Sequence, residues 1–357
     1  MRVLRLNAWK VSFIMLLMLG AIGMAYGQGY NLKMLASDQA GTAPNIDPNL
    51  KNAWGISFSP TGPFWVADNS SGFSTVYNST GVSQGLNVVI PPASGTGKGR
   101  PTGTVYNPTT GFVVTDGTHS APGLFLFDTE DGTISGWSPS VNGTQAFIAV
   151  NHKADRGDNY KGMELASNGT TTLLYTVDFF NAKVRVYDGT WTEVSLSGSF
   201  TDPRLPAGYA PYNIRKLGNR LFVLYAKQNA QKNEAQEGPG LGVVDIFDLN
   251  GNFLRRFTAG GKLNAPWGIA QAPPSFGTFG GTVLIGNLGD GKITAYDANT
   301  GAMKGQLANP QGTTIVIDEL WALTFGNGGQ GGQKNLLYFT SGPGGYRHGR
   351  LGVIAPH

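Results

Sequence analysis

Six polar residues stand at comparable places in a repeated pattern, each directly after a short run of β-branched and aromatic residues. They are Asp68, Asp116, Asp178, Lys227, Asn287 and Ser341. Carboxylate, amide and hydroxyl oxygens are the ligands that Ca²⁺ prefers, so a ring of such residues predicts a calcium site. A carboxylate that ends a strand can equally accept hydrogen bonds from the backbone of the next turn, which is a structural role. The sequence leaves both interpretations open.

Three histidines lie in irregular segments that are expected to be loops. They are His119, His152 and His348. A neutral imidazole can bind a transition metal or act as a general base, which makes all three candidate binding residues. No two of them are closely spaced, so separate exposed loop positions are the alternative.

Three tryptophans recur near the start of a predicted strand. They are Trp54, Trp267 and Trp321. One interpretation is packing between repeats near a common axis, because indole rings bury large apolar areas. The other is an aromatic platform for a sugar or another flat ligand.

These residues are positioned by strands that repeat along the chain. Residues 52–81 contain three short runs of β-branched and aromatic residues, which end at SPTG, DNSSG and NSTG. Such runs between Gly, Pro and Asn clusters predict strands joined by hairpins. Six such units share the residues that follow Gly27, at about 55 residues each, which is the size of a propeller blade. We therefore predict an all-β, six-bladed β-propeller with four-stranded antiparallel blades, as a single domain of residues 28–357.

The last unit shows only three strands, and the missing one is expected at the other end of the chain. Residues 30–37, YNLKMLAS, resemble the outer strands of other units. We expect this segment to join the last blade and close the ring, which leaves no unpaired strand edge at the junction.

One face of the predicted ring receives most of the long loops. In a propeller, the connections from second to third strands and from one blade to the next share a face. The long segments there are residues 91–101, 151–160, 202–211, 226–240 and 341–349. Long ordered loops usually carry function, so this long-loop face is the predicted binding face.

The units resemble the NHL repeat, in which a strand ending in Val-Ala-Asp is followed by a turn with Asn and then by an Arg-Val-x-Val-Tyr pattern. Residues 175–189, YTVDFFNAKVRVYDG, show this pattern, and 66–68, VAD, and 266–269, PWGI, match in part. Units four and six depart from it, with Ala226-Lys227 and Thr340-Ser341 where Asp is expected. The resemblance implies a six-bladed propeller like those of secreted bacterial proteins, and it implies little about chemistry.

The chain is also similar, by residue type, to calcium-dependent lactonases and related six-bladed hydrolases. There a channel Glu holds the metal together with Asn and Asp ligands. The resemblance implies that Glu164, Asn213 and Asn287, with Asp68 or Asp178, supply such ligands here. The flanking motifs of those hydrolases are absent. Calcium is the one cofactor that these residues predict.

The first 27 residues have the layout of a secretory signal. Arg2, Arg5 and Lys10 precede an apolar run at residues 11–24, and Ala25-Tyr26-Gly27 offers small residues at a cleavage site. The run is short for a membrane span. We therefore expect cleavage after Gly27 and a secreted or periplasmic protein without a membrane span.

The composition and net charge limit the kinds of partner that the protein is expected to bind. The chain has no cysteine, which excludes disulfides and thiolate chemistry. Removing the three basic residues of the signal lowers the formal net charge from +4 to +1, so no basic footprint for nucleic acid remains. We expect a monomer with an extracellular ligand or protein partner.

Two functions are compatible with these observations. The first is binding, without catalysis, of a ligand or protein through the long-loop face. The second is a calcium-dependent hydrolase, lactonase or lyase with its site at the mouth of the central channel. Metal analysis and thermal shifts with divalent ions separate the two, because a bound ligand raises apparent stability.

Overall fold

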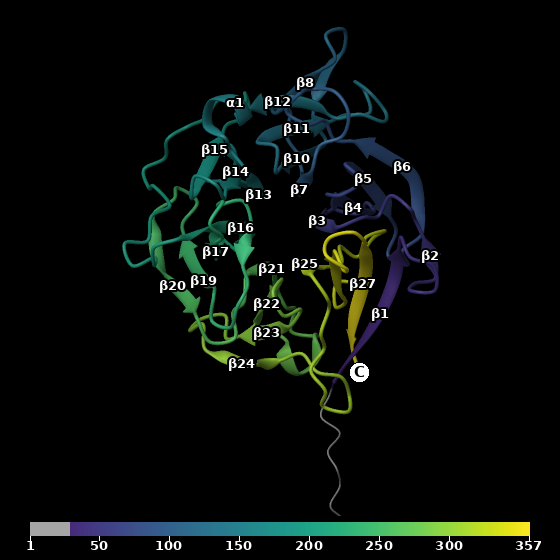
Figure 1. The fold of residues 1–357 in the computed structure, drawn as a ribbon, viewed down its shortest axis with the longest axis vertical. Helices are drawn as coiled ribbons and strands as arrows, with labels where there is room; N and C mark the ends of the chain where they lie inside the picture. Colours follow the sequence, from purple (N-terminus) through teal and green to yellow (C-terminus); the bar gives the residue numbers. More distant parts are fainter. Residues whose placement is uncertain (1–28) are drawn as a thin grey trace, which may run out of the picture.

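The computed structural model describes residues 29–357, and the predicted export signal at residues 1–27 lies outside them. Six sheets stand around a common axis, each with its first strand innermost (Figure 1). The predicted all-β, six-bladed β-propeller is therefore confirmed. Within residues 29–357, no helix is long and apolar enough to cross a membrane.

The strands of each blade run outward from the axis in sequence order. The first three blades are β3 (Ala53–Ser57), β4 (Phe64–Asp68), β5 (Phe73–Tyr77) and β6 (Ser83–Val89); β7 (Pro101–Tyr106), β10 (Phe125–Thr129), β11 (Thr133–Trp137) and β12 (Phe147–Asn151); and β13 (Tyr160–Ser167), β14 (Thr172–Asp178) and β15 (Lys183–Tyr187). The other three are β16 (Tyr209–Leu217), β17 (Arg220–Gln228), β19 (Val243–Phe247) and β20 (Phe253–Ala259); β21 (Pro266–Gln271), β22 (Val283–Asn287), β23 (Ile293–Tyr296) and β24 (Met303–Gln306); and β25 (Leu320–Phe325), β26 (Leu337–Ser341), β27 (Arg350–Pro356) and β1 (Tyr30–Ser37).

The N-terminal strand closes the ring as predicted. β1 pairs antiparallel with β27, from Tyr30 opposite Pro356 to Ser37 opposite Arg350. A two-residue strand, β2 (Asn45–Ile46), adds to its outer edge in parallel. Tyr30 also packs on Phe276 of blade five, with ring centroids 4.8 Å apart. The closing strand therefore connects the last two blades as well as the two ends of the chain.

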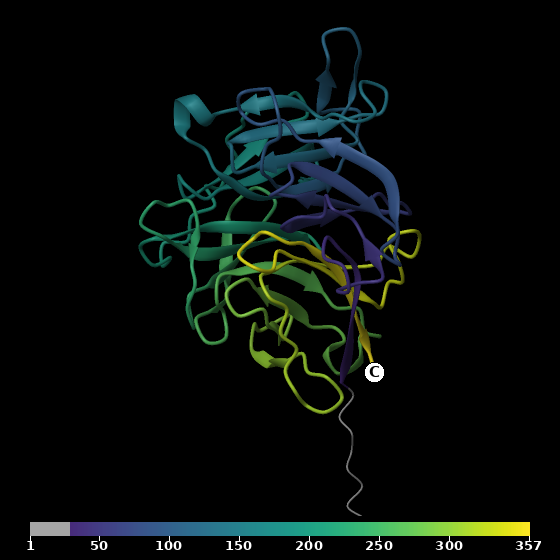
Figure 2. The same ribbon diagram turned by 45° about the vertical axis from the view of Figure 1, so that its right-hand side comes forward.

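Blade two departs from the prediction because it contains an insertion. β8 (Val113–Thr115) and β9 (Ser120–Pro122) pair only with each other. They form a hairpin that projects from the edge of the ring (Figures 1 and 2). The second strand of this blade is β10 rather than residues 113–115, and the third is β11.

Blade three is the least regular sheet. The repeat predicts the fourth strand of this blade at residues 192–200, but the ladder of this segment to β15 consists of a bridge between Tyr187 and Glu193 and a hydrogen bond from Val194 N to Val186 O. In blade four, an additional two-residue strand, β18 (Ala235–Gln236), pairs with the end of β17. The helical segments are short: α1 (Lys153–Arg156) and the 3₁₀ turn η1 (Gly277–Phe279).

The core consists of apolar clusters between adjacent blades. Between blades one and two, for example, Trp65 stacks on Phe125 at 4.1 Å between ring centroids. Middle strands such as β4 and β22 are buried at every residue, because successive side chains point to opposite faces of a blade and each face is covered by a neighbouring blade. Packing between blades, rather than one central core, therefore holds the ring together.

Small residues set the spacing of the innermost strands. A Cβ at Gly268 would lie 2.6 Å from the carbonyl oxygen of Trp321, and one at Gly55 would lie 2.5 Å from that of Thr102. Such approaches are too close for a side chain. The residue that precedes each of these glycines faces the central axis, where the candidate site lies.

Candidate functional site at the two ends of the central axis

One ladder position recurs where the second strand of each blade ends beside the innermost strand. Its occupants are Asp68, Thr129, Asp178, Tyr225, Asn287 and Ser341. The assignments of Asp116 and Lys227 to this position were wrong. Asp116 follows β8 in the inserted hairpin. In blade four, β16 and β17 pair for two residues beyond this position, so Tyr225, opposite Pro211, occupies it and Lys227 lies opposite Tyr209.

The side chains at this position form hydrogen bonds with residues of their own blade or of the loop beside it. The Thr75 hydroxyl donates to Asp68 Oδ2 at 2.6 Å, and Arg185 donates to Asp178 Oδ2 from Nε at 3.1 Å. Asn287 Oδ1 accepts the backbone N–H of Asn264 at 3.1 Å. All three are buried. These contacts favour the structural interpretation of the predicted ring.

The five residues expected to bind calcium do not converge. Glu164 lies beside Arg215 at the end of the axis opposite the long-loop face. We call this the short-turn face, because most of its connections are short hairpin turns, and we call its opening on the axis the short-turn mouth. Asn213 lies in the wall of the axis, where its amide donates to Trp267 O at 2.7 Å and its oxygen accepts the N–H of Ile214. The other three predicted ligands are bound within blades one, three and five, as described above. Across residues 29–357, no three His, Cys, Asp or Glu side chains are grouped so as to hold a metal ion.

Each predicted histidine has a different carboxylate partner. His119 bonds to Asp116 at 3.1 Å. His152 bonds to Asp155 at 3.0 Å, and His348 bonds to Asp38 at 2.9 Å. The structure therefore does not bring the three together. The sequence predicts all three histidines in loops of the long-loop face. For His119 this is wrong, because the β8–β9 hairpin is inserted between the first and second strands of its blade, and that connection belongs to the opposite face.

The three predicted tryptophans meet at the axis. Trp54 stacks on Trp321, with ring centroids 3.6 Å apart, and Trp267 meets both edge-on at 6.3 and 5.9 Å. Tyr212 adds a fourth ring, 6.3 Å from Trp321. All are buried. We call these four rings the aromatic plug, and they confirm the packing interpretation of the tryptophans.

A buried ion network lies against the plug on the long-loop face. Lys161 is 0% exposed, and its ammonium pairs with Glu130 and, at 3.3 Å, with Glu234. It also lies 5.2 Å from the ring centroid of Trp54. Glu130 accepts further bonds from Arg100 at 2.8 Å and Asn69 at 3.0 Å. Burial alone would raise the pKa of Glu130, but the charges of Lys161 and Arg100 outweigh burial and lower it.

Additional carboxylates lie near Tyr346 at the same mouth. Glu319 accepts the backbone N–H of Tyr346 at 3.0 Å. Burial raises the pKa of the Tyr346 phenol, and the charges of Glu237, Glu234 and Glu319 raise it further. Burial likewise raises the pKa of Glu237 and Glu319, with the charge of Asp318 adding to both. We call Tyr346, Glu234, Glu237, Asp318 and Glu319 the acidic rim.

A buried hydroxyl without a partner lies near the acidic rim. Among the described residues, Tyr212 Oη is buried without a hydrogen bond, and so is Trp54 Nε1. Burial raises the pKa of Tyr212 well above its ordinary value, and the nearby charges of Glu234 and Glu130 contribute. Unsatisfied buried polar groups are rare, and they are a mark of functional sites.

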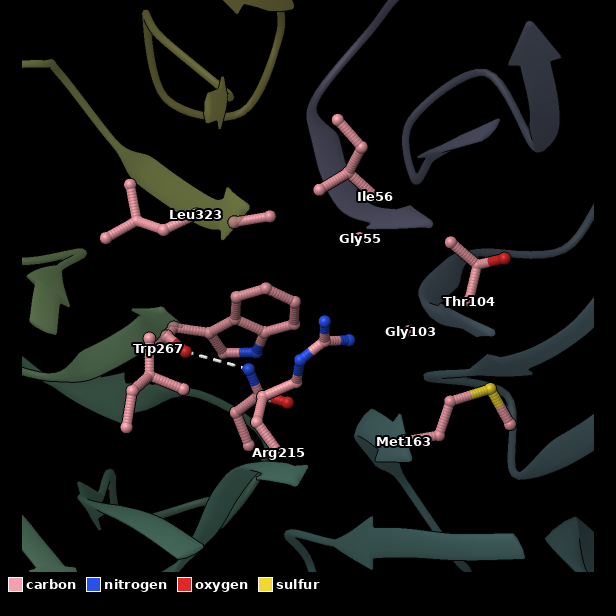
Figure 3. Close-up of a pocket in the computed structure, with 11 residues that line it drawn as sticks. Gly55, Ile56, Gly103, Thr104, Met163, Arg215, Trp267 and Leu323 are labelled. Atoms are coloured by element: carbon pink, nitrogen blue, oxygen red, sulfur yellow. Dashed lines mark hydrogen bonds between the residues drawn. The ribbon is translucent and has the colours of Figure 1, made fainter. Parts of the chain in front are cut away.

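The opposite mouth contains a separate hollow. Below the plug is a cavity of about 10 Å³, room for about one water molecule, lined by residues such as Ile56, Met163 and Leu323. It shares Ile56 and Arg215 with an open pocket of about 200 Å³ on the short-turn face. Figure 3 shows the Arg215 guanidinium pointing toward the axis among these residues.

Sequence reasoning missed the residues that define both mouths. Lys161 was not singled out, although Lys161-Gly162-Met163 aligns with Trp54-Gly55-Ile56 in the repeat. That alignment was the available signal, because it places a charged residue at a tryptophan position. Glu130, Glu234 and Arg215 carry no comparable signal.

Two proteins of Acanthamoeba polyphaga mimivirus resemble the chain in sequence. Uncharacterized protein R648 is 33% identical over 300 residues, which cover 82% of this chain and 73% of R648. Uncharacterized protein L690 is 33% identical over 300 residues, which cover 82% of this chain and 78% of L690. No family model matches the sequence.

Several solved structures share the fold. The aldose sugar dehydrogenase of Escherichia coli has a TM-score of 0.53 at 12% identity, with 92% of this chain and 100% of the enzyme covered. A gluconolactonase of Xanthomonas campestris has a TM-score of 0.52 at 12% identity, with 94% and 93% covered. A streptogramin B lyase has a TM-score of 0.52 at 12% identity, with 92% and 98% covered. At such identities, the likeness concerns the propeller fold alone.

Proposed function

The chain belongs to the same protein family as R648 and L690 of Acanthamoeba polyphaga mimivirus, and we propose that its propeller binds a ligand carrying an organic ammonium group at the long-loop mouth. The observation that carries this proposal is the acidic rim, in which Glu319 accepts the backbone N–H of the half-buried Tyr346 at 3.0 Å and the charges of Glu234 and Glu237 also act on the Tyr346 phenol. The unpaired hydroxyl of Tyr212 is buried near these charges. The site acts by recognition and needs no catalytic group.

The charges at this mouth favour a cation. Lys161 and Arg100 are already paired with Glu130, and Lys161 also pairs with Glu234. Asp318 and Glu237 form no ion pair with another described residue, and Glu319 is held only by backbone N–H groups. The mouth therefore keeps an excess of negative charge.

Aromatic rings complete the recognition surface. Tyr346 lies 6.0 Å from Trp321, and its ring is tilted by 35° against the indole. An ammonium group over such a ring is attracted by the negative face of the π-system, and nearby carboxylates add charge-assisted hydrogen bonds. The same combination disfavours anions, because they would meet the carboxylates of the rim.

Fluorescence titration of the protein with tetramethylammonium and with N-acetyl-lysine amide tests the proposal, since Trp321 lies beside Tyr346. We expect saturable binding that sodium chloride at equal ionic strength does not reproduce. In the double variant Glu237→Gln/Glu319→Gln, affinity should fall about tenfold or more, because charged hydrogen bonds are lost. The matched control Asp116→Asn removes a carboxylate in the distant hairpin and should bind like the parent. Equal affinity in the double variant would refute the proposal.

Measuring thermal stability with and without calcium tests the alternative function. A calcium-dependent hydrolase, lactonase or lyase using Glu164 should gain thermal stability with calcium, and Glu164→Gln should abolish that gain. Stabilisation of this kind, unaffected by Glu237→Gln/Glu319→Gln, would replace the binding proposal. Absence of any calcium shift in the parent protein would support it.

Export belongs to the same proposal. It is supported by the layout of residues 1–27, and kinship of the blades with NHL repeats is supported by the motif at residues 175–189. N-terminal sequencing of protein recovered outside the cytoplasm should begin at Gln28. Protein that retains Met1 and stays in the cytoplasm would refute export. Size-exclusion chromatography with light scattering tests the expected monomer.

A further inference from the structure

The pocket at the short-turn mouth is built around one arginine. Arg215 of β16 and Glu164 of β13 enter it from adjacent blades, and their side chains are 30% and 14% exposed. The remaining lining residues are Ile56, Ser57, Phe58, Val105, Tyr106, Leu165 and Thr324. Arg215 and Glu164 are thus the charged groups of a pocket that is otherwise mostly apolar.

The guanidinium of Arg215 keeps free donors. Its Nε lies 3.5 Å from Glu164 Oε2, a loose contact. Glu164 is held instead by the backbone N–H groups of Lys216 at 2.9 Å and Leu165 at 3.1 Å. Neither terminal nitrogen of Arg215 donates a hydrogen bond to another residue in the described chain. A planar fork of two donors therefore points toward the axis (Figure 3).

Two other hydroxyls of the pocket are already engaged. The hydroxyl of Ser57 shares a hydrogen bond with that of Thr104 at 3.1 Å. The hydroxyl of Thr324 donates to the carbonyl of Phe325 at 3.3 Å. Apart from the hydroxyl of Tyr106, the free donors of the pocket side chains are those of Arg215. A sugar or another polyol would need more free partners than these.

We propose that this pocket binds a small monocarboxylate, with its two oxygens on the terminal nitrogens of Arg215 and its apolar body against Phe58 and Tyr106. Carboxylates match the guanidinium fork in bidentate geometry, and an apolar surrounding strengthens the pair. A doubly charged phosphate would be repelled by Glu164. The volume of about 200 Å³ lies below that of pockets for drug-sized ligands, so the ligand is small.

Ligand-observed NMR with benzoate and its neutral isostere benzamide tests this site in the full-length mature protein. We expect benzoate to bind and benzamide to bind about tenfold more weakly or not at all, because the charge-assisted pair is lost. Arg215→Gln should weaken benzoate binding by at least about tenfold. Equal binding of the two probes, or unchanged benzoate affinity in a folded Arg215→Gln, would overturn the proposal.

A second variant covers the case in which Arg215→Gln does not fold. Glu164→Gln removes the carboxylate that competes with the ligand and keeps the guanidinium. Benzoate should bind this variant more tightly, because repulsion between the two carboxylates is gone. Weaker binding in a folded Glu164→Gln would contradict the assignment.

The test is independent of the long-loop mouth. Glu237→Gln/Glu319→Gln lies on the other side of the aromatic plug and serves as the matched control. It should bind benzoate with the parent's affinity. Loss of benzoate binding in this control would place the ligand at the acidic rim and overturn the proposal for the pocket of Arg215.

Discussion

Asp68 and Asp178 occupy the same ladder position in blades one and three, but they face different partners. The third strand of the blade supplies Thr75 of β5 to Asp68 and Arg185 of β15 to Asp178, in each case two residues along from the direct ladder partner. A threonine hydroxyl donates one hydrogen bond and brings no charge. Oδ1 of Asp68 is buried without a hydrogen bond in the described part of the chain. Burial raises the pKa of Asp68 well above its ordinary value, and the charge of Asp47 raises it further.

Replacing Asp68 by Asn should stabilise the protein at neutral pH. Because the folded-state pKa is raised, the contribution of this carboxyl group to stability is fully present below its unfolded pKa of about 3.9 and is lost as pH rises through the folded pKa. Asn keeps an acceptor for Thr75 and carries no charge. We expect the free energy of unfolding at pH 7 to rise by about 1–3 kcal/mol, with a smaller gain at pH 4. Chemical denaturation at the two pH values measures both.

Asp178→Asn is the matched control for this prediction. It makes the same substitution at the equivalent position, where the carboxylate pairs with Arg185 at 2.9 Å. Here the free energy of unfolding should fall by about 1–3 kcal/mol, because a buried charged hydrogen bond is weakened. Effects of the same sign in both variants would contradict the explanation by partner residue.

The closing strand is the element on which the integrity of the ring depends. Deleting residues 28–37 removes β1, which is the outer partner of β27, together with the buried side chains of Tyr30 and Leu35. The loss of Tyr30 alone should cost about 3–5 kcal/mol, the usual value for a buried aromatic ring. We expect the truncated protein to melt far below the parent in a thermal scan.

The projecting hairpin supplies the control for this deletion. β8 and β9 pair only with each other, so replacing residues 116–119 by Asn-Gly shortens the chain without exposing another strand. This variant should melt close to the parent. A β1 truncation that melts with the parent would show that closure by β1 contributes little to stability.

Blade number, closure and the axial position of the tryptophans were predictable because they depend on local patterns. Strand runs and turn residues recur within each unit, and the segment at 30–37 matches an outer strand wherever it finally pairs. The alternation of apolar and polar residues along a segment predicts a strand without knowledge of the strands beside it. The six-bladed ring followed from counting such units.

The errors arose where pairing, rather than pattern, decides the structure. Residues 113–115 read as a strand and are one, but they pair with β9 outside the blade. In blade four, β16 and β17 pair for two residues beyond the ladder position of Asp68 and Asp178, so that Tyr225 takes the position predicted for Lys227. The point at which a strand ends depends on its partner, which the composition of the strand does not reveal.

The candidate sites were less predictable than the fold for the same reason. Lys161 and Glu130 are in different blades, and their contact exists only because the ring closes. Glu164 was predicted as a calcium ligand by residue type, but nothing in the local sequence of Arg215 distinguishes it from exposed strand residues or indicates that the two residues share a pocket. Recognition of the acidic rim and of the short-turn pocket therefore required the assembled ring.

At the scale of the whole molecule, the aromatic plug separates the axis into two compartments. Trp54, Trp321 and Tyr212 are each no more than 2% exposed, so the long-loop mouth has no open passage to the pocket of Arg215. The charge patterns of the two mouths are opposite in effect. Unpaired carboxylates remain at the acidic rim, whereas unpaired guanidinium donors remain at the short-turn mouth.

This separation predicts that the two ligands bind independently. The proposed sites share no residue and lie on opposite sides of a packed layer, and effects at separate sites without shared partners usually add within about 0.5 kcal/mol. Titrating benzoate in the presence of saturating tetramethylammonium, and the reverse, should change each dissociation constant by less than about threefold. By reciprocity, any larger change must appear equally in both titrations. A reciprocal change of tenfold would show that the plug transmits binding from one mouth to the other, and Trp54→Phe, which keeps a ring but alters its stacking on Trp321, should then alter the coupling.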